Sequence, residues 1–203
     1  MLVAALAACA GPPPDPPALE LVELTPIASP LGDHVLVLGL PGSTEPRIDV
    51  LGVDLDAALD PVAGTVAADG SFLLEIPGRE GDRLRLATER AGRRSAPLDV
   101  VAAFGAAEAA PILLPCLRVP ALLELGGALV VENACEARVL IEEIALRAPA
   151  SLAVRAETPL SIEPGDERVI ELARQGAEPV DEVLLLTVSE PAVERRAITV
   201  FWR

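Results

Sequence analysis

The chain has 203 residues, of which 51% are hydrophobic, so it can form one or two compact cores and is not globally disordered. Its 31 acidic residues outnumber its 16 basic ones, and the resulting net charge of −15 argues against a nucleic acid partner, which requires basic residues that meet phosphates. Twenty prolines and fifteen glycines exclude long-helix bundles and coiled coils, since proline inside a helix costs about 3 kcal/mol.

The N-terminus is a short apolar run that ends in Leu-Ala-Ala-Cys at Cys9. This segment resembles the lipobox of bacterial lipoproteins, in which an apolar residue and two small ones precede the cysteine that receives diacylglycerol. The resemblance implies a truncated signal segment over residues 1–9, a lipid anchor at Cys9 and a place in the cell envelope, with Ala10 favouring the outer membrane. No basic residue precedes Cys9, so we expect the translation start to lie upstream of Met1.

Residues 10–18 are rich in proline and predict a disordered, extended tether of about 3.1 Å per residue. A second apolar stretch, residues 98–117, has the length of a membrane span, but it contains Asp99, Glu108 and two prolines. We interpret it instead as the last strand of one domain, a connector over residues 103–110 and the first strand of the next domain.

From residue 19 onward, short apolar runs alternate with turn signals every 8–12 residues, which is typical of β-sandwiches. The pattern predicts an all-β fold of two tandem sandwiches, over residues 19–102 and 111–203. Residues 35–38 are apolar on both faces, as in a buried central strand, whereas residues 83–86 alternate, as in a strand with one wet face. The predicted strands are 19–24, 34–40, 48–55, 62–67, 72–76, 83–88, 98–101, 116–125, 128–132, 137–146, 152–155, 160–163, 168–173, 183–188 and 196–202.

Both domains resemble immunoglobulin-like modules. Residues 34–101, with Val-Leu-Gly-Leu-Pro at 37–41 and Ala-Asp-Gly-Ser-Phe at 68–72, resemble bacterial Ig-like repeats and carboxypeptidase-regulatory-like modules. Residues 117–203, with a strand ending in Asn133 and an Ile-Glu-Pro-Gly turn at 162–165, resemble ASH-type (MSP-like) Ig domains. These resemblances imply a scaffold or binding module without enzymatic activity.

The other two cysteines, Cys116 and Cys135, are predicted to form a disulfide. If residues 125 and 128 pair across a Gly-Gly hairpin, the two cysteines lie nearly opposite each other, and an exported chain can oxidise them. Two buried thiols are the alternative.

Residues suited to catalysis or metal binding are few. His34 is the only histidine, and no nucleophile elbow, P-loop or zinc-binding spacing is present, so we expect no enzyme activity and no cofactor. Asp54, Asp56 and Asp60 are weak candidates for calcium, because Ala58 occupies the third ligand position of the EF-hand pattern. In a strand, Asp54 and Asp56 would share one face, which we expect to be solvated.

Three further features have open alternatives. The basic turn that holds Arg90, Arg93 and Arg94 is expected to face water, with an anionic ligand as the alternative. Glu142 and Glu143 interrupt an apolar strand, which indicates a strand edge or a bulge. The four aromatic residues argue against carbohydrate binding, which normally uses exposed rings.

These observations predict a lipid-anchored envelope protein with a structural or protein-binding role, facing the periplasm or the cell surface. The alternatives are a calcium-dependent or small-ligand adhesion module and an accessory domain pair for a separate envelope enzyme.

Overall fold

The computed structural model describes residues 16–20, 22–28, 32–57, 60–124, 126, 128–147 and 152–202. Within these residues the fold is all-β, as predicted, with strands and turns and no helix. The predicted signal segment with Cys9 and most of the predicted tether lie outside the described residues.

The N-terminal half contains two sheets. The N-terminal outer sheet has the strand order β5-β2-β1-β9, and the N-terminal inner sheet has the order β4-β3-β6-β7, with β8 also paired to β6. Their bounds are β1 Val22–Ile27, β2 His34–Gly39, β3 Asp49–Asp54, β4 Val62–Thr65, β5 Phe72–Pro77, β6 Arg83–Arg90, β7 Arg93–Arg94, β8 Leu98–Val101 and β9 Gly105–Ala106.

The C-terminal half contains two more sheets. The C-terminal inner sheet has the order β11-β18-β17-β13-β15, and the C-terminal outer sheet has the order β10-β12-β16-β14. Their bounds are β10 Leu117–Arg118, β11 Leu122–Glu124, β12 Leu129–Asn133, β13 Val139–Leu146, β14 Leu152–Arg155, β15 Leu160–Ile162, β16 Glu167–Arg174, β17 Val180–Glu190 and β18 Glu194–Trp202.

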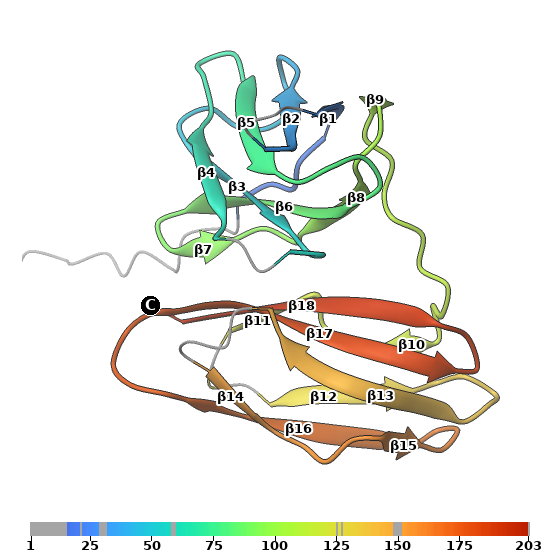
Figure 1. Ribbon diagram of the computed structural model, residues 1–203. Helices are drawn as coiled ribbons and strands as arrows, with labels where there is room; N and C mark the ends of the chain where they lie inside the picture. The colour runs from blue at the N-terminus through green and yellow to red at the C-terminus, as the bar shows by residue number, and fades with distance from the viewer. Residues whose placement is uncertain are drawn as a thin grey trace, which may run out of the picture.

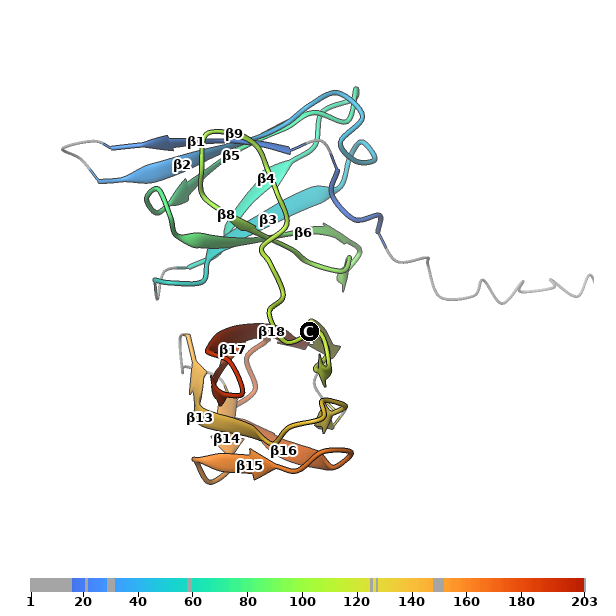
Figure 2. The ribbon, with the colours of Figure 1, turned by 90° about the vertical axis from the view of Figure 1, so that its right-hand side faces the viewer.

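Each half encloses its own apolar core, and the four sheets stack as outer, inner, inner, outer (Figure 1). The connector runs down one side of the stack from the N-terminal half to the C-terminal half (Figure 2). A third apolar cluster lies between the halves and is formed by residues of both inner sheets. Its members are Val53, Leu55, Val183, Leu185 and Ala197.

Close packing in the N-terminal half depends on glycines inside strands. A Cβ atom on Gly39 would lie 2.1 Å from the Phe72 ring, and one on Gly52 would lie 2.3 Å from Ile76. A Cβ atom at either position would therefore require the β5 side chain that packs on it to move.

Two predictions about strand faces were wrong. Residues 35–38 do not form a strand buried on both faces, because Leu38 is 40% exposed on the outer sheet. The strand with that character is β17, where the consecutive residues Val183 to Leu186 are all buried. Likewise, the face of β6 that was expected to be wet is covered, and Arg85 is buried on it.

The predicted strand over residues 116–125 is also not a single strand. It is divided into β10 and β11, which belong to different sheets, and Pro120 lies between them. Proline cannot donate a ladder hydrogen bond, so the chain changes sheets there. The hairpin expected between residues 125 and 128 is not formed either, since β11 and β12 pair with different neighbours.

Candidate functional site

The contact between the two inner sheets, here called the inter-sandwich interface, brings buried charged groups of both halves together. Five arginines contribute to it: Arg83, Arg85, Arg94, Arg147 and Arg195. In sequence the arginines are spread along the chain, but nearly a third of them meet at this one contact. The carboxylates of Asp56, Asp99 and Asp181 lie at the same contact and pair with them.

Arg85 is buried in the interface, with a side chain that is only 4% exposed. Within its own half it forms a bidentate pair with Asp99, with Nε–Oδ1 at 2.7 Å and Nη2–Oδ2 at 2.8 Å. Across the interface it donates to the Ala197 carbonyl at 2.6 Å, to Thr199 Oγ1 at 3.0 Å and to the Ala121 carbonyl at 3.1 Å. All five N–H donors of the guanidinium group are therefore satisfied, three of them by the other half.

Arg94 forms a second bridge across the interface. It donates to both carboxylate oxygens of Asp181, at 2.6 and 2.5 Å, and to Glu89 Oε2 at 3.1 Å. Its guanidinium carbon also lies 5.6 Å from the centre of the Phe201 ring. Burial alone would lower the pKa of Arg94, but the two carboxylates outweigh it and hold that pKa above its ordinary value.

The basic turn was thus only partly predicted. Arg90 pairs with Glu45 at 2.5 Å near the surface, as expected for a turn that faces water. Arg94, in contrast, is 8% exposed and belongs to the interface. The prediction failed for Arg94 because the turn lies against the second half of the chain, and a local pattern gives no sign of that contact.

The edge of the interface is held by further ion pairs. Asp56 accepts a hydrogen bond from Arg195 Nη1 at 2.8 Å and another from the Arg83 backbone N–H at 2.7 Å. Arg147 donates to the Ala57 carbonyl at 3.2 Å, and its pKa is lowered chiefly by burial, with Glu182 acting in the opposite direction. These contacts extend the polar rim around the apolar cluster of Val53 and Leu185.

The three calcium candidates do not converge on one point. Asp54 is buried rather than solvated, Asp56 lies beyond the end of β3 in contact with Arg195, and Asp60 is exposed. Across the described residues there is no group of three or more potential ligands that could hold a metal ion. The shared wet face expected for Asp54 and Asp56 is wrong because β3 ends at Asp54 and its end lies against the second half.

Asp54 is the described carboxylate with a raised pKa. Burial is the main cause, the nearby carboxylates of Asp82 and Asp56 add to it, and a hydrogen bond of 2.7 Å from the Asp56 N–H opposes it. Ionised Asp54 therefore costs stability at neutral pH, and this cost disappears as the pH falls below the pKa of the folded state.

We predict that Asp54→Asn raises the melting temperature at pH 7, because asparagine keeps the acceptor oxygen without the charge. The gain should shrink as the pH falls through the raised pKa of Asp54, where Asp54 itself becomes protonated. Thermal melts of both proteins between pH 4 and 7 measure this difference.

Asp69→Asn is the matched control, and we expect it to change the stability in the opposite direction. The Ser71 hydroxyl and N–H lower the pKa of Asp69 through bonds of 2.6 and 3.0 Å, so its contribution is present above the unfolded pKa and lost on acidification. This variant should be less stable than the wild type at pH 7 and equal to it at low pH. A constant melting difference for Asp54→Asn across the range would contradict the assignment.

The predicted disulfide is present. Cys116 and Cys135 are joined with a Cα–Cα distance of 4.9 Å, and the Ala134 N–H donates to the Cys116 carbonyl at 3.0 Å. The bond attaches the start of β10 to the turn after β12. Its route differs from the predicted hairpin, because β10 pairs directly with β12.

The remaining sequence features are placed as follows. A bulge interrupts the β13 ladder beside Glu142 and Glu143, where the sequence predicted a strand edge or a bulge. Trp202 packs on the C-terminal core and beneath Arg174 at 3.5 Å, whereas Phe201 contacts Arg94. His34 lies on the outer sheet, 3.5 Å from Glu75.

Comparison with protein-family models and with curated proteins gives no match for this chain. In the described part of the chain, no helix has the length and apolar character needed to cross a bilayer.

Proposed function

We propose that this protein is a lipid-anchored cell-envelope protein whose two immunoglobulin-like sandwiches have a structural or protein-binding role without catalysis. The observation that carries the proposal is the Leu-Ala-Ala-Cys box at Cys9, followed directly by the proline-rich residues 12–17. Acylation at Cys9 would attach the chain to the outer membrane, and the tether would separate the sandwiches from the bilayer.

The disulfide supports the same proposal. Disulfides persist in oxidising compartments such as the bacterial periplasm and the cell surface, and are rare in the cytosol. The pair at Cys116 and Cys135 therefore fits an exported protein.

The inter-sandwich interface supports a structural or binding role. Because Arg85 and Arg94 each bond both halves, the two sandwiches present their outer surfaces in a fixed relation. A rigid pair of sandwiches can act as a spacer or can offer extended surfaces to a partner protein. Calcium-dependent adhesion has less support, since Asp56 is engaged by Arg195 and Arg83.

Lipidation is tested by expressing the gene with its upstream DNA in a bacterial host supplied with labelled palmitate. We expect the wild type to incorporate the label and to partition into detergent, and Cys9→Ser to lose both properties, because only the Cys9 thiol would accept the lipid. The double variant Cys116→Ala/Cys135→Ala is the control and should keep both. An unlabelled wild-type protein in the aqueous phase would refute the anchor.

A further inference from the structure

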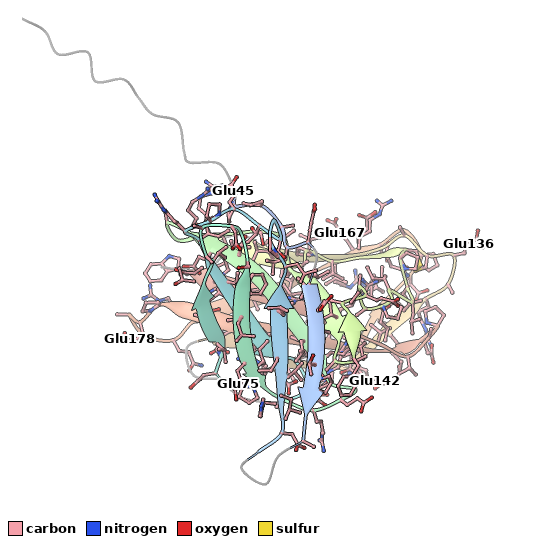
Figure 3. The ribbon with its side chains drawn as sticks, turned by 90° about the horizontal axis from the view of Figure 1, so that it is seen from above. Glu45, Glu75, Glu136, Glu142, Glu167 and Glu178 are labelled. Carbon is pink, nitrogen blue, oxygen red and sulfur yellow. A yellow bond between two sulfur atoms is a disulfide. The ribbon has the colours of Figure 1, made fainter. Side chains whose placement is uncertain are left out.

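The outward face of the N-terminal outer sheet is apolar at its centre. Leu38 of β2 lies directly opposite Leu73 of β5, and these side chains are 40% and 61% exposed. The half-buried Leu36 lies on the same face, two residues along β2. Seen from above, β5, β2, β1 and β9 lie side by side, with none of the other described strands drawn across them (Figure 3).

An exposed aromatic residue lies at the other edge of this sheet. β9 pairs with β1 so that Gly105 lies opposite the inward-facing Leu24 and Ala106 opposite the outward-facing Glu23. Phe104 directly precedes β9, in a bend, and is 68% exposed. The outward sheet face that carries the exposed Leu38 and Leu73 is here called the outer apolar face, and Phe104 lies at its edge.

Another strand of this molecule shows how a strand with apolar residues on both faces is covered. A strand with consecutive apolar residues is typical of a sheet covered on both faces. β17 has this pattern, and its second face is covered at the inter-sandwich interface by Val53 and Leu55. β2 has the same pattern in residues 35–38, but its second face forms part of the outer apolar face.

The charges on the outer apolar face are negative. Glu23 lies beside Leu38 on β1, and Glu75 lies beside Leu36 on β5. The two carboxylates are on strands that flank β2 and are two residues out of step, which places them about 12 Å apart by ordinary strand spacing. The paired strand positions of this face carry no arginine, and its other titratable group is His34, 3.5 Å from Glu75.

We propose that the outer apolar face is the docking surface for another protein, whose contact region presents apolar side chains flanked by two cationic ones about 12 Å apart. The inter-sandwich interface uses the same chemistry, since its apolar cluster is accompanied by arginine–carboxylate pairs. A second copy of this chain fits poorly, since the acidic residues of both copies would meet. The proposal rests on the protein-binding role proposed above and gives that role a surface and a partner chemistry.

The test uses the purified, ¹⁵N-labelled full chain and two synthetic peptides of equal length, one alternating leucine with arginine and the other leucine with glutamate. The leucine–arginine peptide should shift the amide signals of β1, β2 and β5, and the leucine–glutamate peptide should leave them in place. Leu73→Glu should weaken binding at least tenfold. The double variant Glu23→Arg/Glu75→Arg should reverse the preference between the peptides.

Val193→Glu is the matched control, because Val193 is 75% exposed in the turn between β17 and β18 and should not contribute. Absence of binding, equal binding of both peptides, or shifts confined to other strands would overturn the proposal. So would a concentration-dependent dimer in sedimentation velocity that Leu73→Glu abolishes, since the occupant would then be a second copy. None of these readouts depends on lipidation, so failure here is distinct from failure of the Cys9 test.

Discussion

Arg85→Ala is expected to lower the free energy of unfolding by about 3 kcal/mol and to separate the unfolding of the two halves. Removing one partner of a buried ion pair leaves the other charge buried without a partner, which costs about 3–5 kcal/mol of stability. Asp99 is partly exposed, so we expect a value at the lower end of this range. The carbonyls of Ala121 and Ala197 and the Thr199 hydroxyl lose a donor as well.

The measurement is urea denaturation followed by two probes. Fluorescence of Trp202 reports on the C-terminal half, and far-UV circular dichroism reports on both halves. The two curves should coincide in the wild type and diverge in Arg85→Ala, because coincident transitions are the mark of a single cooperative unit.

Two variants make the result specific. Arg85→Lys keeps the charge but has three donors in place of five, so its stability should fall between those of the wild type and the alanine variant. Arg138→Ala removes an exposed ion pair with Glu190 and should leave the stability almost unchanged. Coincident curves and a loss below about 1 kcal/mol for Arg85→Ala would show that the interface does not couple the halves.

The importance of Arg85 also shows where sequence reasoning reaches its limit. The alternation of residues 83–86 correctly predicted a strand with Arg83 and Arg85 on one face and Leu84 and Leu86 in the core. The two-residue alternation of a strand shows which residues share a face, but it does not show what covers that face. Water was assumed where the second sandwich lies.

Other features were accessible from the sequence because their causes are local. The strand rhythm predicted the all-β fold, since turns rich in glycine and proline punctuate short apolar runs. The run of apolar residues from Val183 to Leu186 was a usable sign of a doubly covered strand, and it would have indicated the inter-sandwich interface. Arg94 gave no such sign, because its partner Asp181 lies 87 residues away in the sequence.

In the candidate site, too, the features with local causes could be predicted and those with long-range causes could not. The disulfide could be predicted because Cys116 and Cys135 are only 19 residues apart, although the hairpin expected to join them was wrong. The outer apolar face could not be predicted, because it depends on the register of β2 against β5, and these two strands lie far apart in the sequence.

The second large effect is expected at the disulfide, where Cys116→Ala/Cys135→Ala should lower the free energy of unfolding by about 3 kcal/mol. A cross-link between residues 19 apart limits the conformations of the unfolded chain, and releasing it stabilises the unfolded state by about this amount in the chain-entropy model. Folded-state contacts nearby should survive. The buried Asn133 bonds Ala137, Ile162 and Cys135 independently of the sulfur atoms.

Urea denaturation distinguishes this origin from a loss of native packing. If the effect acts through the unfolded state, the transition midpoint falls while the dependence of the free energy on urea becomes steeper, because the unlinked chain exposes more surface. Wild type treated with a reducing agent should match the double variant, and reduction should leave the double variant unchanged. An equal loss of stability without the steeper slope would place the contribution of the disulfide in the folded state. In that state Glu194 also holds the connector, because it accepts hydrogen bonds from the Leu113 and Leu114 N–H groups at 3.1 and 2.8 Å.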